Sequence, residues 1–112
     1  SISIALELNI KPDIIKLALK NFNGVQRRFQ LIDTYKNSKI IDDYGHHPEE
    51  IKAALSATKL IAEKSKVLAI FQPHRYSRLK NHFNEFCSCF NDADEVVLLN
   101  VYAAGEKKNS KL

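Results

Sequence analysis

The sequence predicts an α/β fold in which a parallel or mixed sheet carries helices on both faces. One observation is a pair of unbroken apolar runs of strand length, residues 67–71 (VLAIF) and 96–99 (VVLL). Such runs are typical of strands covered on both faces, as in a parallel sheet. The other is that amphipathic helical patterns separate the expected strands from residue 39 onward. This alternation favours right-handed crossovers and parallel pairing.

The first part of the chain is expected to hold two helices. Residues 2–8 are mostly apolar and are interpreted as the end of one helix. The second begins near Lys11-Pro12-Asp13, because proline suits a first helical turn, and it ends at Asn23-Gly24. Its buried side is expected to consist of Ile14, Ile15, Ala18, Leu19 and Phe22.

From residue 27 the patterns predict a hairpin and then alternating helices and strands. Residues 27–36 and 39–42 are the expected hairpin strands, with a tight turn at residues 36–38. Pro48 suits the first turn of a helix that continues to residue 62. The tail, residues 106–112, shows no structural pattern. A further helix is expected to turn one apolar face to the core: Leu79, Phe83, Phe86, Cys87 and Phe90.

The length and composition indicate one domain, or one domain with a piece of another, at 112 residues. No apolar run approaches the roughly 20 residues that a membrane helix needs, and no basic segment precedes an apolar stretch at the start. We therefore expect neither a membrane partner nor a signal peptide. The absence of an initiator methionine suggests that the chain begins inside a longer protein.

Charge and cysteine content limit the partners. A net charge of +4 and a pI of about 9.1 suit anionic ligands such as phosphates. The lysines are scattered singly, as on a solvated surface, so no nucleic-acid partner is expected. Cys87 and Cys89 lie two residues apart in a helical pattern and point to different faces. This spacing predicts neither a disulfide nor a zinc site. It suits a reducing environment, so we expect a cytoplasmic protein.

Two polar clusters dominate the chain, residues 42–48 (DDYGHHP) and 72–78 (QPHRYSR). Each follows an expected strand and opens an expected helix, and a third turn follows at residues 100–105 (NVYAAG). In an open α/β sheet, ligands bind at the turns that leave the carboxyl ends of the strands. The three turns are therefore predicted to lie along one edge of the sheet and to form one composite site.

The residue types in these turns suit a nucleotide or another anion. Asp42 and Asp43 offer acceptors for ribose hydroxyls, and Gly45 allows a ligand to approach the backbone. Arg75 and Arg78 share a face of one helical turn, where a guanidinium can hold a carboxylate or phosphate through two hydrogen bonds. Three histidines that titrate near neutral pH are suited to accept a proton from an amine: His46, His47 and His74.

Structural roles are open for several of the same residues. A histidine at a helix start is commonly a capping or surface residue, and Arg27-Arg28 suits an exposed edge strand as well as a phosphate site. Tyr44 and Tyr76 could equally be structural residues whose rings cover the edge of the hydrophobic core. Metal binding is not expected, because adjacent side chains diverge and no His-x-x-x-His or cysteine pair supports it. The sequence also contains no Gly-x-x-x-x-Gly-Lys-[Ser/Thr], Gly-x-Gly-x-x-Gly or Gly-x-Ser-x-Gly loop.

Four segments together resemble a known family. They are residues 24–29 (GVQRRF), 42–51 (DDYGHHPEEI), 71–78 (FQPHRYSR), and 93–94 with 101–106 (AD and VYAAGE). Their order and spacing across most of the chain closely resemble the Mur ligase family, in the branch that adds L-alanine. A related branch that recycles murein tripeptide shares the histidine-rich turn but does not resemble the 72–78 cluster.

The resemblance implies a three-domain enzyme of which this chain is an internal piece. Residues 1–22 resemble the C-terminal helices of the central ATP-binding domain, and residues 23–112 the N-terminal part of the C-terminal Rossmann-like ligase domain. In the family, ATP and Mg²⁺ serve to phosphorylate the lactyl carboxylate of UDP-N-acetylmuramate, and L-alanine then attacks the acyl phosphate. The central and N-terminal domains, with the phosphate loop and most Mg²⁺ ligands, are missing here. The chain alone is therefore expected to be inactive.

The resemblance also implies roles for individual residues. Asp43 is expected to bind the ATP ribose, and Arg28 to lie near nucleotide phosphate. The expected L-alanine site consists of Tyr44, His46, Arg75 and Arg78, with an arginine on the carboxylate. Either His46 or His74 is expected beside the amine, so the predicted catalytic group is His46, His74, Arg75 and Arg78.

Two other classes of function stay open at this point. One is a stand-alone module that binds a nucleotide or an amino acid and has lost catalysis. The other is a small basic nucleic-acid-binding domain, which needs a stripe of basic residues with exposed aromatic side chains. The aromatic residues here fall mainly on apolar faces, which disfavours the second class.

Overall fold

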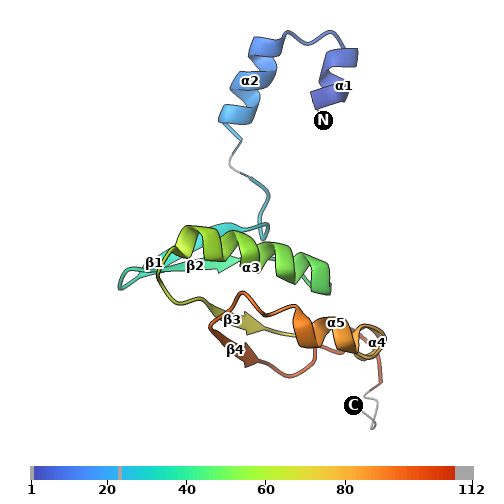
Figure 1. Cartoon of the computed structure of the whole chain (residues 1–112). Coiled ribbons are helices and arrows are strands. Elements are labelled where there is room, and N and C mark those ends of the chain that lie inside the picture. Colours follow the sequence, from blue (N-terminus) through green and yellow to red (C-terminus); the bar gives the residue numbers. More distant parts are fainter. Residues whose placement is uncertain (1, 23, 108–112) are drawn as a thin grey trace.

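The computed structural model describes residues 2–22 and 24–107. In chain order its helices and strands are α1 (Ile2–Glu7), α2 (Pro12–Lys20), β1 (Gln30–Tyr35), β2 (Ser38–Asp42), α3 (Pro48–Ala62), β3 (Leu68–Phe71), α4 (Tyr76–Asn81), α5 (Phe83–Ser88) and β4 (Glu95–Leu98) (Figure 1). None of the helices in this part of the chain has the length and apolarity that crossing a bilayer requires.

The strands form two small sheets of opposite kind. β1 and β2 are an antiparallel hairpin whose register shifts between Leu31 and Asp33, which marks a bulge. β3 and β4 are parallel, with Leu68 opposite Glu95 and Phe71 opposite Leu98. The expected α/β class is confirmed, as are the hairpin and the two later strands. The strands do not form the one expected sheet among the described residues, where the hairpin and the parallel pair are separate.

The unbroken apolar run of β3 predicts a strand covered on both faces. Leu68 and Ile70 are instead 55% and 66% exposed. The prediction is wrong for the described part of the chain, because nothing there covers these two side chains.

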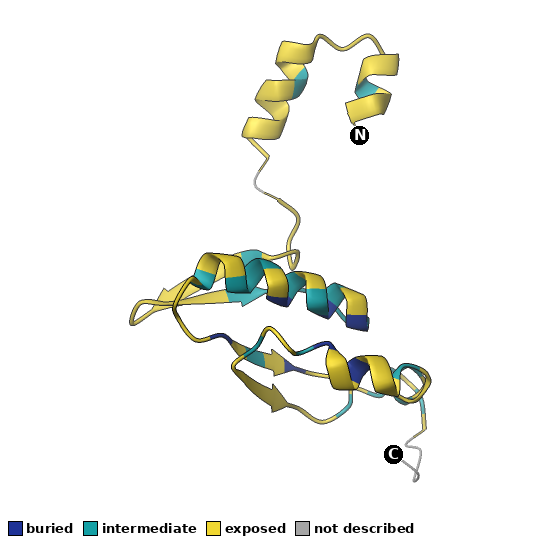
Figure 2. Cartoon of the chain, in the orientation of Figure 1, coloured by how far each residue is buried: buried dark blue, intermediate teal, exposed yellow. Residues whose placement is uncertain are grey.

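The core lies where α3 and α5 pack against β3 (Figure 2). α3 starts at Pro48, whose fixed φ suits the first turn, and Glu49 and Glu50 follow where the helix dipole favours acidic groups. The helical period then brings Ile51 and Leu55 to the same side. The buried apolar side chains are Ile51, Leu55, Val67, Phe71, Phe86 and Cys89.

Helices α1 and α2 stand apart from this core (Figure 1). The radius of gyration is therefore 18.0 Å, against about 13 Å for a compact domain of this length. The expectation that α2 buries its apolar side is wrong here, because Ile14 and Phe22 are 56% and 62% exposed. An amphipathic helix buries its stripe only against a partner face, and the described residues provide none. The predicted helix end at Asn23 lies outside the described residues, as do residues 108–112 of the tail.

The helix expected at residues 79–90 is two short helices, α4 and α5, that meet at His82. The His82 backbone has φ −120° and ψ 28°, so the helical rotation restarts there. As a result the prediction that Cys87 belongs to the core is wrong: Cys87 is exposed and Cys89 is buried. Phe83, also expected in the core, is exposed, while Phe86 is buried as predicted.

Candidate functional site

The three polar turns meet at one edge of the structure, as the sequence predicts. The two segments that follow β3 and β4 stay in register. The backbone N–H of Tyr102 donates to the Pro73 carbonyl, and the backbone N–H of Arg75 donates to the Tyr102 carbonyl, both at 2.8 Å. The Gln72 side chain adds a hydrogen bond to the Asn100 carbonyl at 3.2 Å. These contacts extend the parallel pairing beyond the strands to an isolated bridge between His74 and Tyr102.

A row of aromatic rings crosses this edge from one turn to the next. The rings of Tyr44 and His46 lie 5.1 Å apart, centroid to centroid. His46 lies 6.0 Å from His74, and His74 lies 5.4 Å from Tyr102. The row therefore joins three turns that are far apart in the sequence, namely the turns that follow β2, β3 and β4.

Arg78 is tied to His74 one turn before it. Its Nη1 donates to the His74 ring Nδ1 at 3.0 Å and to the His74 carbonyl at 3.2 Å. A guanidinium only donates, so Nδ1 is the acceptor and the neutral ring carries its hydrogen on Nε2. Desolvation lowers the pKa of His74, and the positive charges of Arg78 and Arg75 lower it further. These effects all favour the neutral form of His74.

His46 has the opposite tautomer. Its Nδ1 lies 3.0 Å from the Tyr44 carbonyl oxygen, which only accepts, so Nδ1 donates. The same nitrogen lies 3.7 Å from a carboxylate oxygen of Glu50. In the neutral ring, Nε2 of His46 is consequently a free acceptor, whereas the corresponding nitrogen of His74 is a donor.

Glu50 holds the histidine turn in place and was missed as a functional residue by the sequence reasoning. Its carboxylate accepts the backbone N–H groups of His46 and His47 at 2.9 and 3.1 Å. The hydrogen bond from His46 is the main reason that the pKa of Glu50 is lowered. Its position three residues after His47, at a helix start, is the spacing of a capping box, and that signal could have identified it.

Asp43 fixes the same turn from the other side. One carboxylate oxygen accepts the Phe29 N–H at 2.8 Å, and the other accepts the Gly45 N–H at 2.6 Å. A Cβ on residue 45 would lie 2.8 Å from the second oxygen, so only glycine fits without moving the carboxylate. The neighbouring Asp42 pairs with Nε of Arg27 at 3.3 Å, and the Arg27 guanidinium lies 5.0 Å from the Tyr44 ring centroid.

The structure leaves two predicted site residues less constrained. The hydrogen bonds and ion pairs among the described residues do not include the side chain of Arg28 or of Arg75. Arg28 is exposed, and its charge helps to lower the pKa of Glu50. Arg75 is exposed and has a positive φ of 70° directly before α4, in a region that non-glycine residues rarely adopt.

Glu106 connects the third turn to α4. Its carboxylate accepts the backbone N–H of Ser77 at 3.0 Å and the Ser77 hydroxyl. The hydroxyl is the main reason that the pKa of Glu106 is lowered. This contact positions the helix that carries Arg78, and the sequence reasoning assigned no role to either residue.

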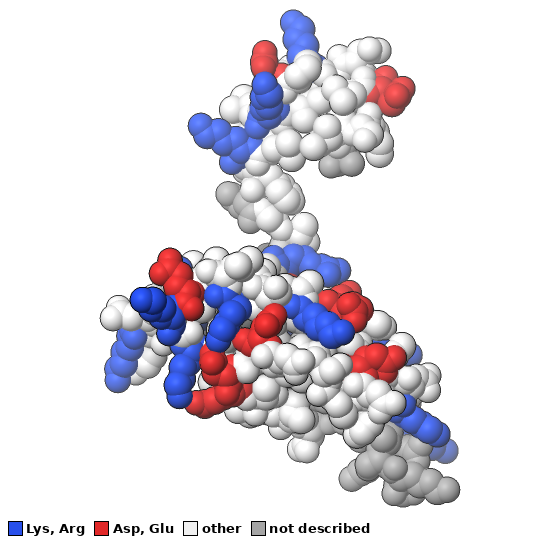
Figure 3. Space-filling view, in the orientation of Figure 1, with Lys and Arg blue, Asp and Glu red and all other residues white. Residues whose placement is uncertain are grey.

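The site is polar but not a metal cluster. Among residues 2–22 and 24–107, no three His, Cys, Asp or Glu side chains gather as a metal ion would require. Acidic and basic side chains are interspersed on the face shown in Figure 3, without a stripe of one sign. The arrangement suits a small anion beside neutral imidazoles.

Comparison with known proteins supports a family assignment. A sequence profile described as Mur ligase, glutamate ligase domain, matches residues 27–111. A relative in Methylobacterium radiotolerans, named UDP-N-acetylmuramate–L-alanine ligase, is 51% identical over 107 residues, 96% of this chain and 23% of the relative. One of the same name in Rickettsia felis is 50% identical over 109 residues, with the same coverage.

A solved structure shares the fold. It is the UDP-N-acetylmuramate-alanine ligase of Thermotoga maritima, 36% identical, with a TM-score of 0.78 over 94% of this chain and 23% of that chain. The chain thus spans about a quarter of the length of the relatives it matches (23%). With the profile covering most of the sequence and the fold shared, the chain belongs to the Mur ligase family.

Proposed function

We propose that this chain supplies the amino-acid and ribose side of the active site of an ATP-dependent ligase that joins L-alanine to UDP-N-acetylmuramate. The product is a peptidoglycan precursor, and the dependence on ATP locates the reaction in the cytoplasm. The observation that carries the proposal is the meeting of Tyr44, His46, His74 and Arg78 at one edge of the structure. The names of the relatives, and their sequence identity of 51% and 50% to this chain, support it.

The proposal divides the chain between two domains. Residues 1–22 belong to the end of a central ATP-binding domain, and residues 23–112 begin the C-terminal ligase domain. The separation of α1 and α2 from the core supports this division (Figure 1). Because closure of both domains is needed to exclude water and assemble the site, the chain is inactive alone.

The nucleotide side of the site would use Asp43 and Arg28. Each Asp43 oxygen accepts one backbone N–H and retains a lone pair for a ribose hydroxyl. Arg28 is exposed and free to approach a phosphate. Mg²⁺ would neutralise phosphate charge when bound, and its ligands would come mostly from outside this chain.

The amino-acid side would use Tyr44, His46, Arg75 and Arg78. Only Nη1 of Arg78 is engaged by His74, so its remaining N–H groups are available to hold the L-alanine carboxylate through two hydrogen bonds. The exposed Arg75 adds a second positive charge at the same helix start. Both arginines would place the amine near the two histidines.

In the proposed reaction the lactyl carboxylate becomes an acyl phosphate at the expense of ATP. The L-alanine amine then attacks the acyl carbon, the carbon–oxygen bond to phosphate breaks, and the amide forms with release of ADP, phosphate and a proton. We assign that proton to His46, because Nε2 of its neutral ring is an acceptor. His74 would orient Arg78 and donate from Nε2.

A chimera tests this proposal. Residues 1–112 replace the matched segment of the Rickettsia felis relative, and phosphate release is measured with UDP-N-acetylmuramate, ATP and Mg²⁺, with and without L-alanine. Release should require L-alanine and fall about a hundredfold for Arg78→Ala, roughly 2.7 kcal/mol of transition-state stabilisation. The matched control is Lys80→Ala, an exposed cation on the same helix, which should have little effect.

A chimera that binds L-alanine but releases no phosphate would favour the alternative, a binding module without catalysis. Release that does not depend on L-alanine would overturn the proposed acceptor.

A further inference from the structure

We propose that His82 is a positioning residue for the ligase reaction, because its ring packs against His47 and thereby fixes the two halves of the L-alanine site relative to each other. One half is the turn that carries His46, and the other is helix α4, which carries Arg78. The inference rests on the proposed function. The two imidazole rings lie 4.7 Å apart, centroid to centroid, at an interplanar angle of 66°. Aromatic rings favour such edge-to-face contacts.

His82 is joined directly to the helix that carries Arg78. The backbone N–H of His82 donates to the Arg78 carbonyl at 3.1 Å and closes the last turn of α4. The His82 carbonyl accepts the backbone N–H of Phe86 at 2.9 Å, and Phe86 is one of the buried core residues. The position of α4 is therefore coupled to the position of His82.

His47 is joined as directly to the turn that carries His46. The two residues are neighbours in the chain, and their backbone N–H groups donate to the same carboxylate of Glu50 at 2.9 and 3.1 Å. Pro48 follows at the start of α3 and is fully buried, with the fixed φ of a proline. The ring contact therefore connects two segments that are each held in place by their own backbone contacts.

The substrate makes the separation of the two halves important. L-alanine carries its carboxylate and its amine on one carbon atom, so Arg78 and His46 can engage both groups only over a narrow range of separations. The other contact between the halves passes through His74, whose ring lies 6.0 Å from that of His46. The contact of His47 with His82 is closer, at 4.7 Å. It is therefore the tighter of the two links that determine this separation.

An ion pair at the helix junction does not account for His82 equally well. Its Nδ1 lies 3.6 Å from a carboxylate oxygen of Glu85, and the two side chains are 36% and 53% exposed. Exposed pairs of this kind contribute little, because water screens them. The contact with His47 is therefore the feature of His82 that bears on the site, and removal of the Glu85 charge should leave the site unaltered.

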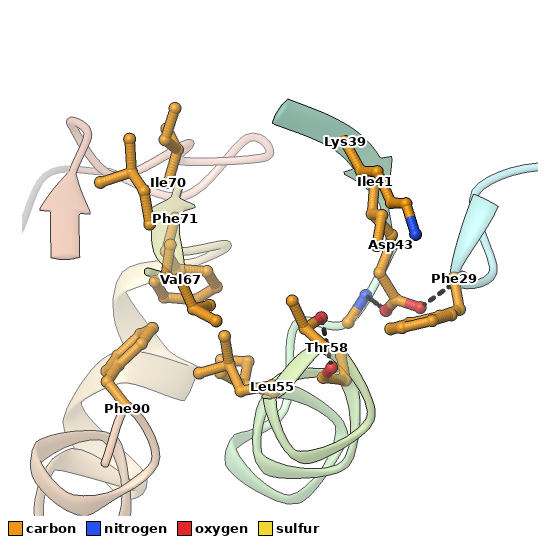
Figure 4. A pocket seen from close by; sticks show the side chains of 15 residues that line it. Phe29, Lys39, Ile41, Asp43, Leu55, Thr58, Val67, Ile70, Phe71 and Phe90 are labelled. Carbon is orange, nitrogen blue, oxygen red and sulfur yellow. Dashed lines mark hydrogen bonds between the residues drawn. The ribbon is translucent and has the colours of Figure 1, made fainter. Parts of the chain in front are cut away.

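The nucleotide side of the site has separate supports. Figure 4 shows the Asp43 carboxylate beside β2, where it accepts the backbone N–H groups of Phe29 and Gly45. None of these groups belongs to α4 or α5. Loss of the contact between His47 and His82 should therefore weaken the binding of L-alanine and leave the binding of ATP unaltered.

Steady-state kinetics of the chimera with the Rickettsia felis relative test this split. His82→Ala should raise the KM for L-alanine about tenfold and change the KM for ATP by less than about twofold. His82→Phe keeps a ring against His47 and should return the KM for L-alanine to within about threefold of the wild-type value. The matched controls Asn84→Ala and Glu85→Gln, at exposed positions of α5, should leave both KM values unaltered. An unchanged KM for L-alanine in His82→Ala, or an equal rise in both KM values, would overturn the inference.

NMR of the isolated chain adds an outcome that does not depend on catalysis. Cross-relaxation should connect the ring protons of His47 and His82, and His82→Ala should shift the ring resonances of His46 more than Asn84→Ala does. Absence of cross-relaxation between the two rings would overturn the inference even in an active chimera. A wild-type chimera without L-alanine-dependent phosphate release would overturn the proposed function instead, and the NMR result would still decide whether the ring contact exists.

Discussion

The Arg78 guanidinium donates to Nδ1 of His74 across 3.0 Å and so selects the tautomer of that ring. The contact links the residue proposed to hold a carboxylate to an imidazole beside the proposed amine position. Because Arg78 can only donate, protonation of His74 at Nδ1 and this hydrogen bond exclude each other. The charge state of His74 therefore depends on Arg78.

Replacement of Arg78 by alanine should raise the pKa of His74. Desolvation lowers this pKa first and Arg78 second, so the substitution removes only part of the shift. NMR titration of the ring in the isolated chain measures the change, and Lys80→Ala provides a control that should leave it unaltered. An unchanged pKa in Arg78→Ala would contradict the assigned contact.

The same pKa predicts how stability depends on pH. The folded pKa of His74 lies below the ordinary value of 6.5, so below that pH the unfolded state binds the proton more readily. The free energy of unfolding should therefore fall as pH drops through 6.5 toward the folded pKa. Urea titrations at several pH values should show a smaller fall for His74→Asn, which cannot titrate.

Glu50→Gln should destabilise the histidine turn by about 1 kcal/mol, since the charge-assisted hydrogen bonds to two backbone N–H groups weaken. Glu49→Gln is the matched control; Glu49 is exposed and contacts only Lys52 among the ion pairs described, so its loss should cost less than about 0.5 kcal/mol. The pKa of Glu50 is lower in the folded state than its ordinary value. The stability that Glu50 contributes should therefore be fully present at a pH above the ordinary pKa, and it should be lost as the pH falls through the folded-state pKa. Equal destabilisation by the two substitutions would refute the positioning role.

Gly45→Ala should destabilise the chain by about 1–2 kcal/mol, because the new Cβ meets a carboxylate that cannot move without losing its bonds. The contact is with Asp43, so the two positions should couple. In an Asp43→Ala background the penalty of Gly45→Ala should shrink markedly, as a double-mutant cycle in urea would show. Additive penalties would mean that the turn excludes alanine for another reason.

The two cysteines should differ sharply in reactivity. Cys87 is exposed, whereas Cys89 is buried, donates from Sγ to the Phe86 carbonyl, and has a pKa raised by desolvation. A thiol reagent should modify Cys87 at least about a hundredfold faster, because the thiolate is the reactive form and must be accessible. The variant Cys89→Ser reports the rate of Cys87, and Cys87→Ser reports the rate of Cys89. Similar rates for the two thiols would contradict the break between α4 and α5 at His82.

Much of this structure follows from local patterns. The hairpin at residues 30–42, the helix that starts at Pro48 and the buried residues Ile51 and Leu55 are predictable, because turn residues, caps and hydrophobic period act within a few positions. The convergence of the three turns is also predictable, since parallel strands joined by crossovers bring their carboxyl ends to one edge.

Other features depend on contacts between distant segments. The helical pattern at residues 79–90 continues through His82, and only packing against α3 and β3 determines that Cys89 rather than Cys87 is enclosed. The exposure of α2 likewise reflects the absence of a partner face in the described residues, which no pattern within the helix reveals.

The residue types of the site, its place at the strand ends and its family are therefore readable from the chain, because they depend on local order along the sequence. The opposite tautomers of His46 and His74, the clamp formed by Glu50 and the contact between His47 and His82 are not. These features arise from distances between groups that folding brings together, and a hydrogen bond or a ring contact exists only once those distances are set.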